Sequence, residues 1–130
     1  MTRSVGIVLV SHSAELASGL RALLLQVAAD TLAVEAAGGT DDGRLGTSYH
    51  LVASAIKRAD RGAGIVVLPD LGSSVLTARA VLADHPAPDV VLVDAPFVEG
   101  AVVAAVTAST GASLQAVAAA AREARHASKL

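Results

Sequence analysis

The sequence VGIVLVSHS at residues 5–13 decides the fold of this chain. Residues 5–10 form an aliphatic run, interrupted only by one glycine, of the kind found in strands that are covered on both faces. The run ends at His12 between two serines, and from Ser13 onward the apolar residues recur at a helical period. The stretch therefore predicts a buried strand that delivers one imidazole to its carboxyl end.

Three more short apolar runs follow, and each gives way to a turn and then to a helical pattern. The predicted strands cover residues 5–10, 32–37, 65–68 and 90–93, and the predicted helices begin near residues 13, 47, 73, 97 and 113. Strands that alternate with helices favour a parallel sheet with right-handed crossovers. We therefore expect an α/β fold, a doubly wound and mostly parallel four-stranded sheet of order 2-1-3-4 with helices on both faces. We expect one domain over residues 1–130.

The first predicted helix carries its large apolar residues on one stripe, which we expect to face the core. The stripe consists of Leu16, Leu20, Leu23, Leu24 and Val27. Small hydroxyl residues are frequent helix caps. The expected caps, in chain order, are Ser11 or Ser13, Thr47 or Ser48, Ser73 or Ser74, and Ser113.

The expected strand order brings two polar residues together. Ligands of doubly wound folds bind outside the carboxyl ends of the strands, where the strand order reverses. In the order 2-1-3-4 the first and third strands are neighbours at that point, and His12 follows the first while Asp70 follows the third. We therefore expect His12 and Asp70 to lie close together, with Asp41, Asp42 and Asp94 on the same rim.

A carboxylate beside an imidazole suits nucleophilic chemistry. When the carboxylate accepts a hydrogen bond from one ring nitrogen, the other nitrogen keeps a lone pair of fixed direction. We predict that His12 is a phosphoryl carrier and that Asp70 orients its ring. Helix N-terminal amides and hydroxyl groups bind phosphoryl oxygens. The predicted phosphate- and partner-binding residues are Ser11, Ser13, Thr47, Gly72 and Ser73.

Structural roles remain open for each of these residues. A lone histidine at a strand end is often structural, and an aspartate close to a proline and a glycine, like Asp70 in Pro69-Asp70-Leu71-Gly72, is a common turn residue. The glycine-rich loop at residues 38–43 lacks the lysine of a phosphate-binding P-loop, so direct nucleotide binding is not expected. The acidic residues of the rim either attract a basic partner or are solvated loop residues.

Composition excludes several classes of function. The 130 residues carry a net charge of −2 and only 2% aromatic side chains, so nucleic acid is not an expected partner. The chain has no cysteine and no two histidines at metal-ligand spacing, so we expect no metal site. No apolar run approaches the roughly 20 residues that span a membrane, and no signal peptide is recognisable. We expect a cytoplasmic protein.

Four stretches of the chain resemble a known family. They are Val10-Ser11-His12-Ser13, GGTDDGRLGTS at residues 38–48, LPDLGSS at 68–74 and DAPFVEGA at 94–101. Together they resemble the mannose-type enzyme IIA family of the sugar phosphotransferase system, and within it the phosphotransfer subunits of phosphoenolpyruvate-dependent dihydroxyacetone kinases. The sugar-transport branch typically has Thr-His-Gly at the first site and Gly-Gly-Thr/Ser-Pro at the third, where this chain has Ser11-His12-Ser13 and Gly72-Ser73-Ser74-Val75.

The resemblance implies a relay of one phosphoryl group. His12 would accept it from the histidine phosphocarrier protein HPr on Nε2, while Asp70 holds Nδ1. The phosphoryl group would then pass to ADP that is held in the nucleotide-binding subunit of the kinase, and the resulting ATP would phosphorylate dihydroxyacetone on a third subunit. The chain itself would bind no cofactor directly. Family members form homodimers, and their fold can add an antiparallel edge strand near the C-terminus, although Phe97 onward has a helical pattern here.

Other functions fit parts of the pattern. One alternative is a mannose-type enzyme IIA that serves sugar transport. A tetrapyrrole metal chelatase also places a histidine after its first strand, but His50, His85 and His126 are badly placed to supply a second histidine in the pocket. A small regulatory module without catalysis, of the receiver kind, would use an aspartate at a strand end together with a lysine at a later strand end, which this chain lacks.

Overall fold

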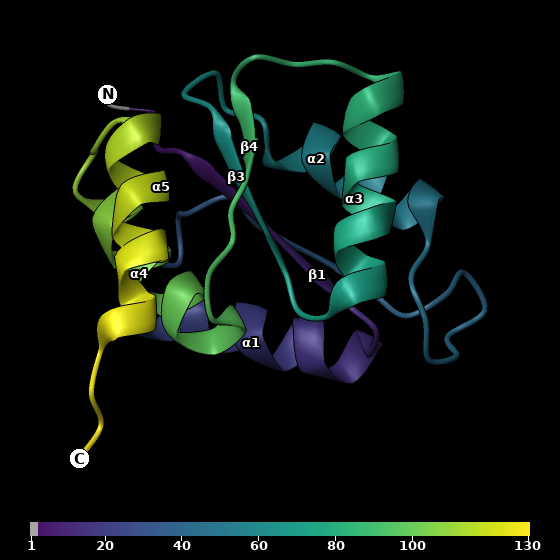
Figure 1. Ribbon diagram of the computed structural model, residues 1–130. Helices are drawn as coiled ribbons and strands as arrows, with labels where there is room; N and C mark the ends of the chain where they lie inside the picture. Colours follow the sequence, from purple (N-terminus) through teal and green to yellow (C-terminus); the bar gives the residue numbers. More distant parts are fainter. Residues whose placement is uncertain (1–2) are drawn as a thin grey trace.

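The computed structural model describes residues 3–130 as a sheet with helices on both faces (Figure 1). The four strands are β1 (Gly6–Ser11), β2 (Val34–Gly38), β3 (Ile65–Pro69) and β4 (Val90–Leu92). The helices are α1 (Ala14–Val27), α2 (Tyr49–Ala59), α3 (Gly72–Asp84), α4 (Phe97–Ser109), α5 (Leu114–Glu123) and the 3₁₀ turn η1 (Ala124–His126). All strand pairs are parallel and the order is β2-β1-β3-β4, which confirms the predicted topology.

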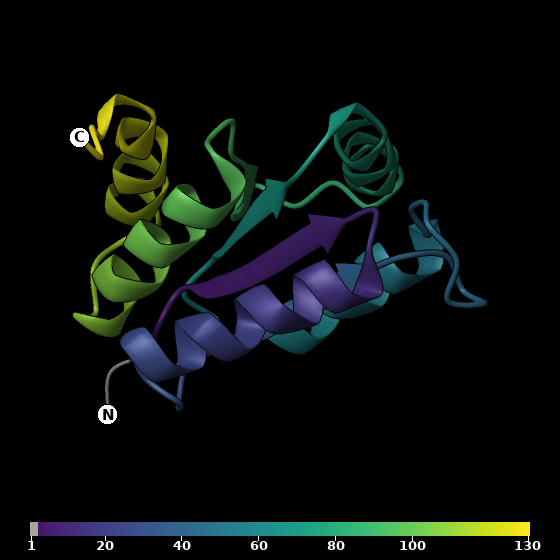
Figure 2. The same ribbon diagram turned by 90° about the horizontal axis from the view of Figure 1, so that it is seen from below.

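The side chains of β1 divide the core between two layers. Ile7 and Leu9 pack in the cluster that α1, α4 and α5 cover, whereas Val8 and Val10 pack in the cluster beneath α2 and α3. This alternation is the period of two that a strand imposes on its side chains. Both faces of β1 are therefore buried, as its aliphatic run predicts, and Figure 2 shows α1 and α4 next to each other on their side of the sheet.

The strand register fixes the edge at which the polar residues gather. Val10 of β1 is the partner of Ala37 on β2 and of Pro69 on β3, so the three strands end at the same level. The N–H of Asp70 donates to the carbonyl of Val10 over 2.9 Å. The residues that follow β1 and β3 are thereby held side by side.

The predicted stripe of α1 is only partly correct. Leu20 and Leu24 are buried together with Ala17, but Leu16, Leu23 and Val27 are 46%, 40% and 50% exposed. The residues at positions 17, 20 and 24 meet the sheet and α4, so only a narrow face of the helix reaches the core. The other large apolar residues of the predicted stripe lie at its solvent-facing flank.

Most of the predicted boundaries are confirmed to within two residues. Ser13, Ser48 and Ser113 each cap a helix by accepting an N–H group through the side chain. The predicted cap of α3 is wrong, because that helix begins at Gly72 without a side-chain cap and its serines bond to other groups. Phe97 begins a helix, as predicted, and four strands make up the sheet of residues 3–130. No helix in that range is long and apolar enough to cross a membrane.

The close packing of β1 against the end of α2 predicts a large effect at Gly6. A Cβ atom added there would lie 2.2 Å from the carbonyl oxygen of Ala59, which is backbone and cannot swing aside. We expect Gly6→Ala to lower the free energy of unfolding by about 3 kcal/mol in urea titrations. Gly19→Ala is the control, because an added Cβ on that face of α1 meets nothing within 4 Å. This variant should raise the free energy of unfolding by at most about 1 kcal/mol, since alanine is the better helix former. Equal stability of Gly6→Ala and the parent would contradict this packing.

Candidate active site

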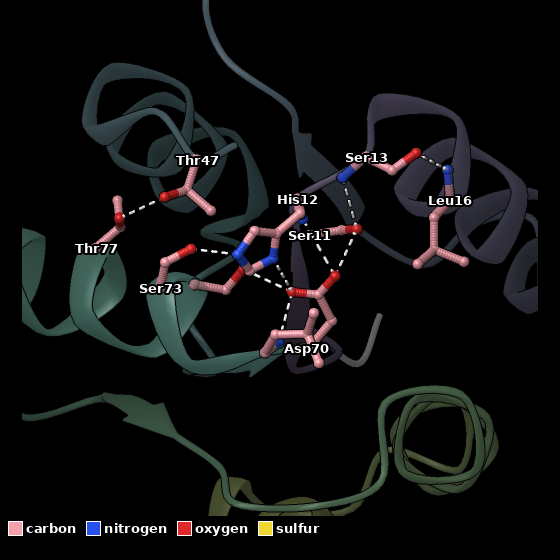
Figure 3. A network of polar contacts seen from close by, with 10 residues as sticks. Ser11, His12, Ser13, Leu16, Thr47, Asp70, Ser73 and Thr77 are labelled. Carbon is pink, nitrogen blue, oxygen red and sulfur yellow. Dashed lines mark hydrogen bonds and ion pairs between the residues drawn. The ribbon is translucent and has the colours of Figure 1, made fainter. Parts of the chain in front are cut away.

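His12 and Asp70 lie together at the carboxyl ends of β1 and β3, as the strand order predicts (Figure 3). His12 Nδ1 is 2.9 Å from Asp70 Oδ1. The His12 side chain is 26% exposed and the Asp70 side chain 9% exposed. The carboxylate is thus set into the surface, while the imidazole is reachable from outside.

The Asp70 carboxylate accepts hydrogen bonds at both oxygens. Oδ1 accepts from the Leu71 N–H and from the Ser74 hydroxyl, each at 2.6 Å, in addition to the Nδ1 contact. Oδ2 accepts from the Ser11 hydroxyl at 2.8 Å and from the backbone N–H of His12 at 3.1 Å. The donors come from β1, from the β3–α3 turn and from α3, so three parts of the fold orient one carboxylate.

These donors determine the charge of Asp70. Burial raises its pKa, but hydrogen bonds from Ser74, His12 and Ser11 outweigh burial and lower the pKa to about 2. Asp70 is therefore a carboxylate at neutral pH. An anionic acceptor at Nδ1 favours the imidazole tautomer whose proton is on Nδ1, and that tautomer leaves a lone pair on Nε2.

Ser73 contacts the other ring nitrogen. Its hydroxyl forms a hydrogen bond with His12 Nε2, and with the Nδ1–H tautomer the hydroxyl is the donor. Ser73 lies in the first turn of α3, whose initial N–H groups have no partner within the helix. The Ser73 hydroxyl therefore lies against the nitrogen that carries the lone pair, at the N-terminal turn of α3.

The remaining predicted site residues have partners of their own. The Ser11 hydroxyl is fully buried, donates to Asp70 and accepts the Ser13 N–H, so it bonds within the site and not outward. The Ser13 hydroxyl accepts the Leu16 N–H as a helix cap. Thr47 pairs with Thr77 over 2.7 Å, which ties the loop before α2 to α3. Gly72 is the first residue of α3.

The sequence reasoning did not include Ser74 in the site. Ser74 is fully buried, and its hydroxyl is 2.6 Å from Asp70 Oδ1 and 3.3 Å from His12 Nδ1. The signal available in the sequence was its spacing, because a residue four positions after Asp70, at the start of a helix, is one turn along the chain.

The glycine-rich loop packs on the backbone of the histidine. The Gly46 N–H donates to the His12 carbonyl over 2.9 Å, and the Gly39 N–H donates to the Ser11 carbonyl over 3.1 Å. Gly39 and Gly46 have φ angles of +76° and +137°, which side chains other than glycine rarely adopt. The loop thereby supports the site through its backbone.

The acidic residues of the rim are largely matched by cations. Asp42 pairs with Arg44 at 3.0 Å, and Asp94 pairs with Arg125 at 3.5 Å. The Asp41 carboxylate accepts the Ser48 hydroxyl. Arg44 and Arg125 thus offset part of the negative potential that the sequence suggests.

The comparisons with known proteins agree with this geometry. Residues 6–118 match the family model EIIA-man, which is described as the PTS system fructose IIA component. The chain belongs to the mannose-type enzyme IIA family. A protein of similar structure has been solved and is described as the unknown function protein EF1359. It is 33% identical to this chain, with a TM-score of 0.81, and the match covers 93% of this chain and 95% of that protein.

Curated relatives identify the branch of the enzyme IIA family. The PEP-dependent dihydroxyacetone kinase 2 phosphoryl donor subunit DhaM of Listeria innocua is 36% identical over 116 residues, which are 87% of this chain and 93% of that protein. The PTS-dependent dihydroxyacetone kinase phosphotransferase subunit DhaM of Lactococcus lactis is 34% identical, and the match covers 86% of this chain and 89% of that protein. The longer Escherichia coli DhaM is 36% identical, and the match covers 25% of it. Within the enzyme IIA family this chain is of the DhaM type, as its motifs suggest.

The lowered pKa of Asp70 predicts a pH-dependent contribution to stability. A carboxyl group whose pKa is lower in the folded protein stabilises the fold above its unfolded pKa, here near 3.8, and loses that contribution as the pH falls toward about 2. We expect Asp70→Asn to be less stable than the parent by a constant amount above about pH 5. The difference in the free energy of unfolding between the parent and Asp70→Asn should become smaller between about pH 4 and about pH 2.5 in urea titrations. A gap that does not change with pH would show that the ionised carboxylate contributes no net stability.

Proposed function

We propose that this chain is a phosphohistidine carrier that accepts a phosphoryl group from HPr on His12 Nε2 and passes it to ADP held in the nucleotide-binding subunit of a dihydroxyacetone kinase. The observation that carries the proposal is the contact of His12 Nδ1 with Asp70 Oδ1 at 2.9 Å, on an imidazole whose other nitrogen is hydrogen-bonded to the Ser73 hydroxyl. The names of the curated relatives support the choice of kinase, since they are phosphoryl donor subunits.

The geometry suggests how each group acts in the transfer. The Nε2 lone pair attacks phosphorus, the bond from phosphorus to the donor's histidine nitrogen breaks, and the imidazole of His12 becomes a cation that keeps its proton on Nδ1. The Asp70 carboxylate stabilises that cation, because the two groups are hydrogen-bonded and mostly shielded from water. The Ser73 hydroxyl leaves Nε2 and donates to a phosphoryl oxygen, beside the first amides of α3.

A second transfer, to ADP, discharges the carrier. The β-phosphate of bound ADP attacks phosphorus, the N–P bond breaks and neutral His12 is restored with its lone pair on Nε2. In this account the chain binds neither dihydroxyacetone nor a cofactor of its own, and the third subunit of the kinase carries the sugar. We also propose, from the resemblance to the family, that the chain works as a homodimer in the cytoplasm.

Exposed leucines around the site are suited to docking of the two partners. Leu45, Leu71 and Leu76 are 80%, 63% and 66% exposed. Leu45 precedes the glycine that bonds to His12, Leu71 donates its N–H to Asp70, and Leu76 is one turn beyond Ser73. Apolar side chains that become buried at the centre of an interface supply much of its binding energy.

We expect the double variant Leu71→Gln/Leu76→Gln to raise the KM for phospho-HPr about tenfold, with kcat within a factor of about two, since the loss of two apolar contacts costs about 1.4 kcal/mol or more. Glutamine adds no charge near the phosphoryl group, so the chemical step is not disturbed. Leu23→Gln, at an exposed position of α1, is the matched control and should leave both constants unchanged. An equal rise of KM in the control, or none in the double variant, would remove these leucines from the docking surface.

The proposed function is tested by reconstitution. The chain is incubated with phosphoenolpyruvate, enzyme I, HPr, the ADP-loaded nucleotide-binding subunit and the dihydroxyacetone-binding subunit, and dihydroxyacetone phosphate is measured. We expect product only when this chain is present. Charging of the chain by HPr, followed by transfer to a sugar-specific enzyme IIB and not to the ADP-loaded subunit, would instead establish the sugar-transport alternative.

A further inference from the structure

We propose that Ser74 is a positioning residue for phosphoryl transfer, whose hydroxyl selects the imidazole tautomer of His12 that leaves Nε2 free to react. This inference rests on the proposed function and assigns a role to a residue that touches no phosphoryl group. It concerns the tautomer of the uncharged protein, which can be observed without any transfer reaction.

The burial of Ser74 makes its hydroxyl dependent on the site. The residue is completely buried in the first turns of α3, and a buried hydroxyl without a partner is costly. Its proton goes to Asp70 Oδ1, which is 2.6 Å away, and not to His12 Nδ1, which is 3.3 Å away. The hydroxyl oxygen therefore turns a lone pair toward the ring nitrogen.

That arrangement discriminates between the two neutral tautomers. With the proton on Nδ1, the N–H points at Oδ1 and also faces the lone pair of Ser74, so both contacts are attractive. With the proton on Nε2, the Nδ1 lone pair would face Asp70 Oδ1, and Ser74 could donate to Nδ1 only by giving up its 2.6 Å hydrogen bond to that carboxylate. Ser74 thus adds to the preference that the carboxylate alone would impose.

Ser74 also fixes the carboxylate plane together with Ser11. The last torsion of an aspartate is broad, so both oxygens must be held if one of them is to face the ring. Ser74 from α3 holds Oδ1 and Ser11 from β1 holds Oδ2, at 2.6 Å and 2.8 Å. Without Ser74, Oδ1 keeps only the Leu71 N–H and the His12 ring as donors, so fewer contacts hold the plane of the carboxylate.

The variant Ser74→Ala tests this role. Alanine is the stronger helix former and leaves no polar atom without a partner in α3, so we expect the variant to fold. We record ¹⁵N correlations of the neutral His12 ring and the rate of charging by phospho-HPr on the same samples. Ser54→Ala is the control, since Ser54 is half-buried on α2 and is not among the hydrogen-bond partners of His12 or Asp70.

In the parent and in Ser54→Ala, we expect the Nδ1–H tautomer to dominate. In Ser74→Ala, the Nε2–H tautomer should become detectable and charging should slow about tenfold, as expected when a reacting group is misoriented. An unchanged tautomer in Ser74→Ala overturns the proposal, whether or not the rate falls. If the parent itself takes no phosphoryl group from HPr while the tautomer still shifts in Ser74→Ala, the proposed function fails and the positioning role of Ser74 stands.

Discussion

Replacing His12 with alanine is expected to abolish acceptance of the phosphoryl group, with a loss of about a thousandfold or more in the charging rate. The reason is that the His12 ring supplies the reacting nitrogen and is held by Asp70 on one side and contacted by Ser73 on the other. The measurement is incorporation of labelled phosphate from phosphoenolpyruvate through enzyme I and HPr. The label should be lost in acid and kept in base, because it is bound to nitrogen.

The matched control for this variant is another histidine. His50 is exposed on α2, and His50→Ala should accept label at the rate of the parent. His12→Ala should fold, because the side chain is partly exposed and the other four donors to Asp70 remain. Label of the same acid lability in folded His12→Ala would show that the carrier is another residue.

Replacing Asp70 with asparagine is expected to slow charging by about 10³-fold while leaving the chain folded. An asparagine carries no charge to stabilise the imidazolium. Its amide group also has donors of its own, and these conflict with the five donors that converge on this position. Stopped-flow measurements of transfer from phospho-HPr give the rate.

Asp94→Asn is the control for the charge alone. Asp94 is 97% exposed on the same rim and does not contact His12, so its loss should change the rate by less than about twofold. Equal rates for Asp70→Asn and the parent would remove Asp70 from the mechanism. Similar slowing in both variants would indicate that the general acidity of the rim matters more than the contact with Nδ1.

The pair at the centre of the site was predictable because it follows from topology. One aliphatic run ends at His12 and a second ends before Asp70. The strand order makes these two strands neighbours, which brings the two side chains together. The order of strands and helices along the chain is enough to predict this arrangement, and no side-chain contact has to be known in advance. The caps of α1, α2 and α5 were predictable for a different reason, since each depends on only a few consecutive residues.

The parts that the sequence did not reveal depend on three-dimensional detail. The hydroxyl of Ser11 turns inward to Asp70, whereas that of Ser73 reaches the imidazole, although both adjoin the same site. Which leucines of α1 are buried depends on where the sheet and α4 pack against the helix. The ion pair of Asp94 depends on Arg125, which is far along the chain. None of these contacts leaves a periodic signal in the sequence.

The most direct test of the account is to identify the phosphorylated atom. The chain, labelled with ¹⁵N in its histidines, is charged by phospho-HPr, and phosphorus–nitrogen couplings together with mass spectrometry of peptides locate the group. The account predicts one phosphoryl group on His12, bonded to Nε2, with Nδ1 still protonated and facing Asp70. A phosphoryl group on Nδ1 of His12, on another residue, or on none would contradict it.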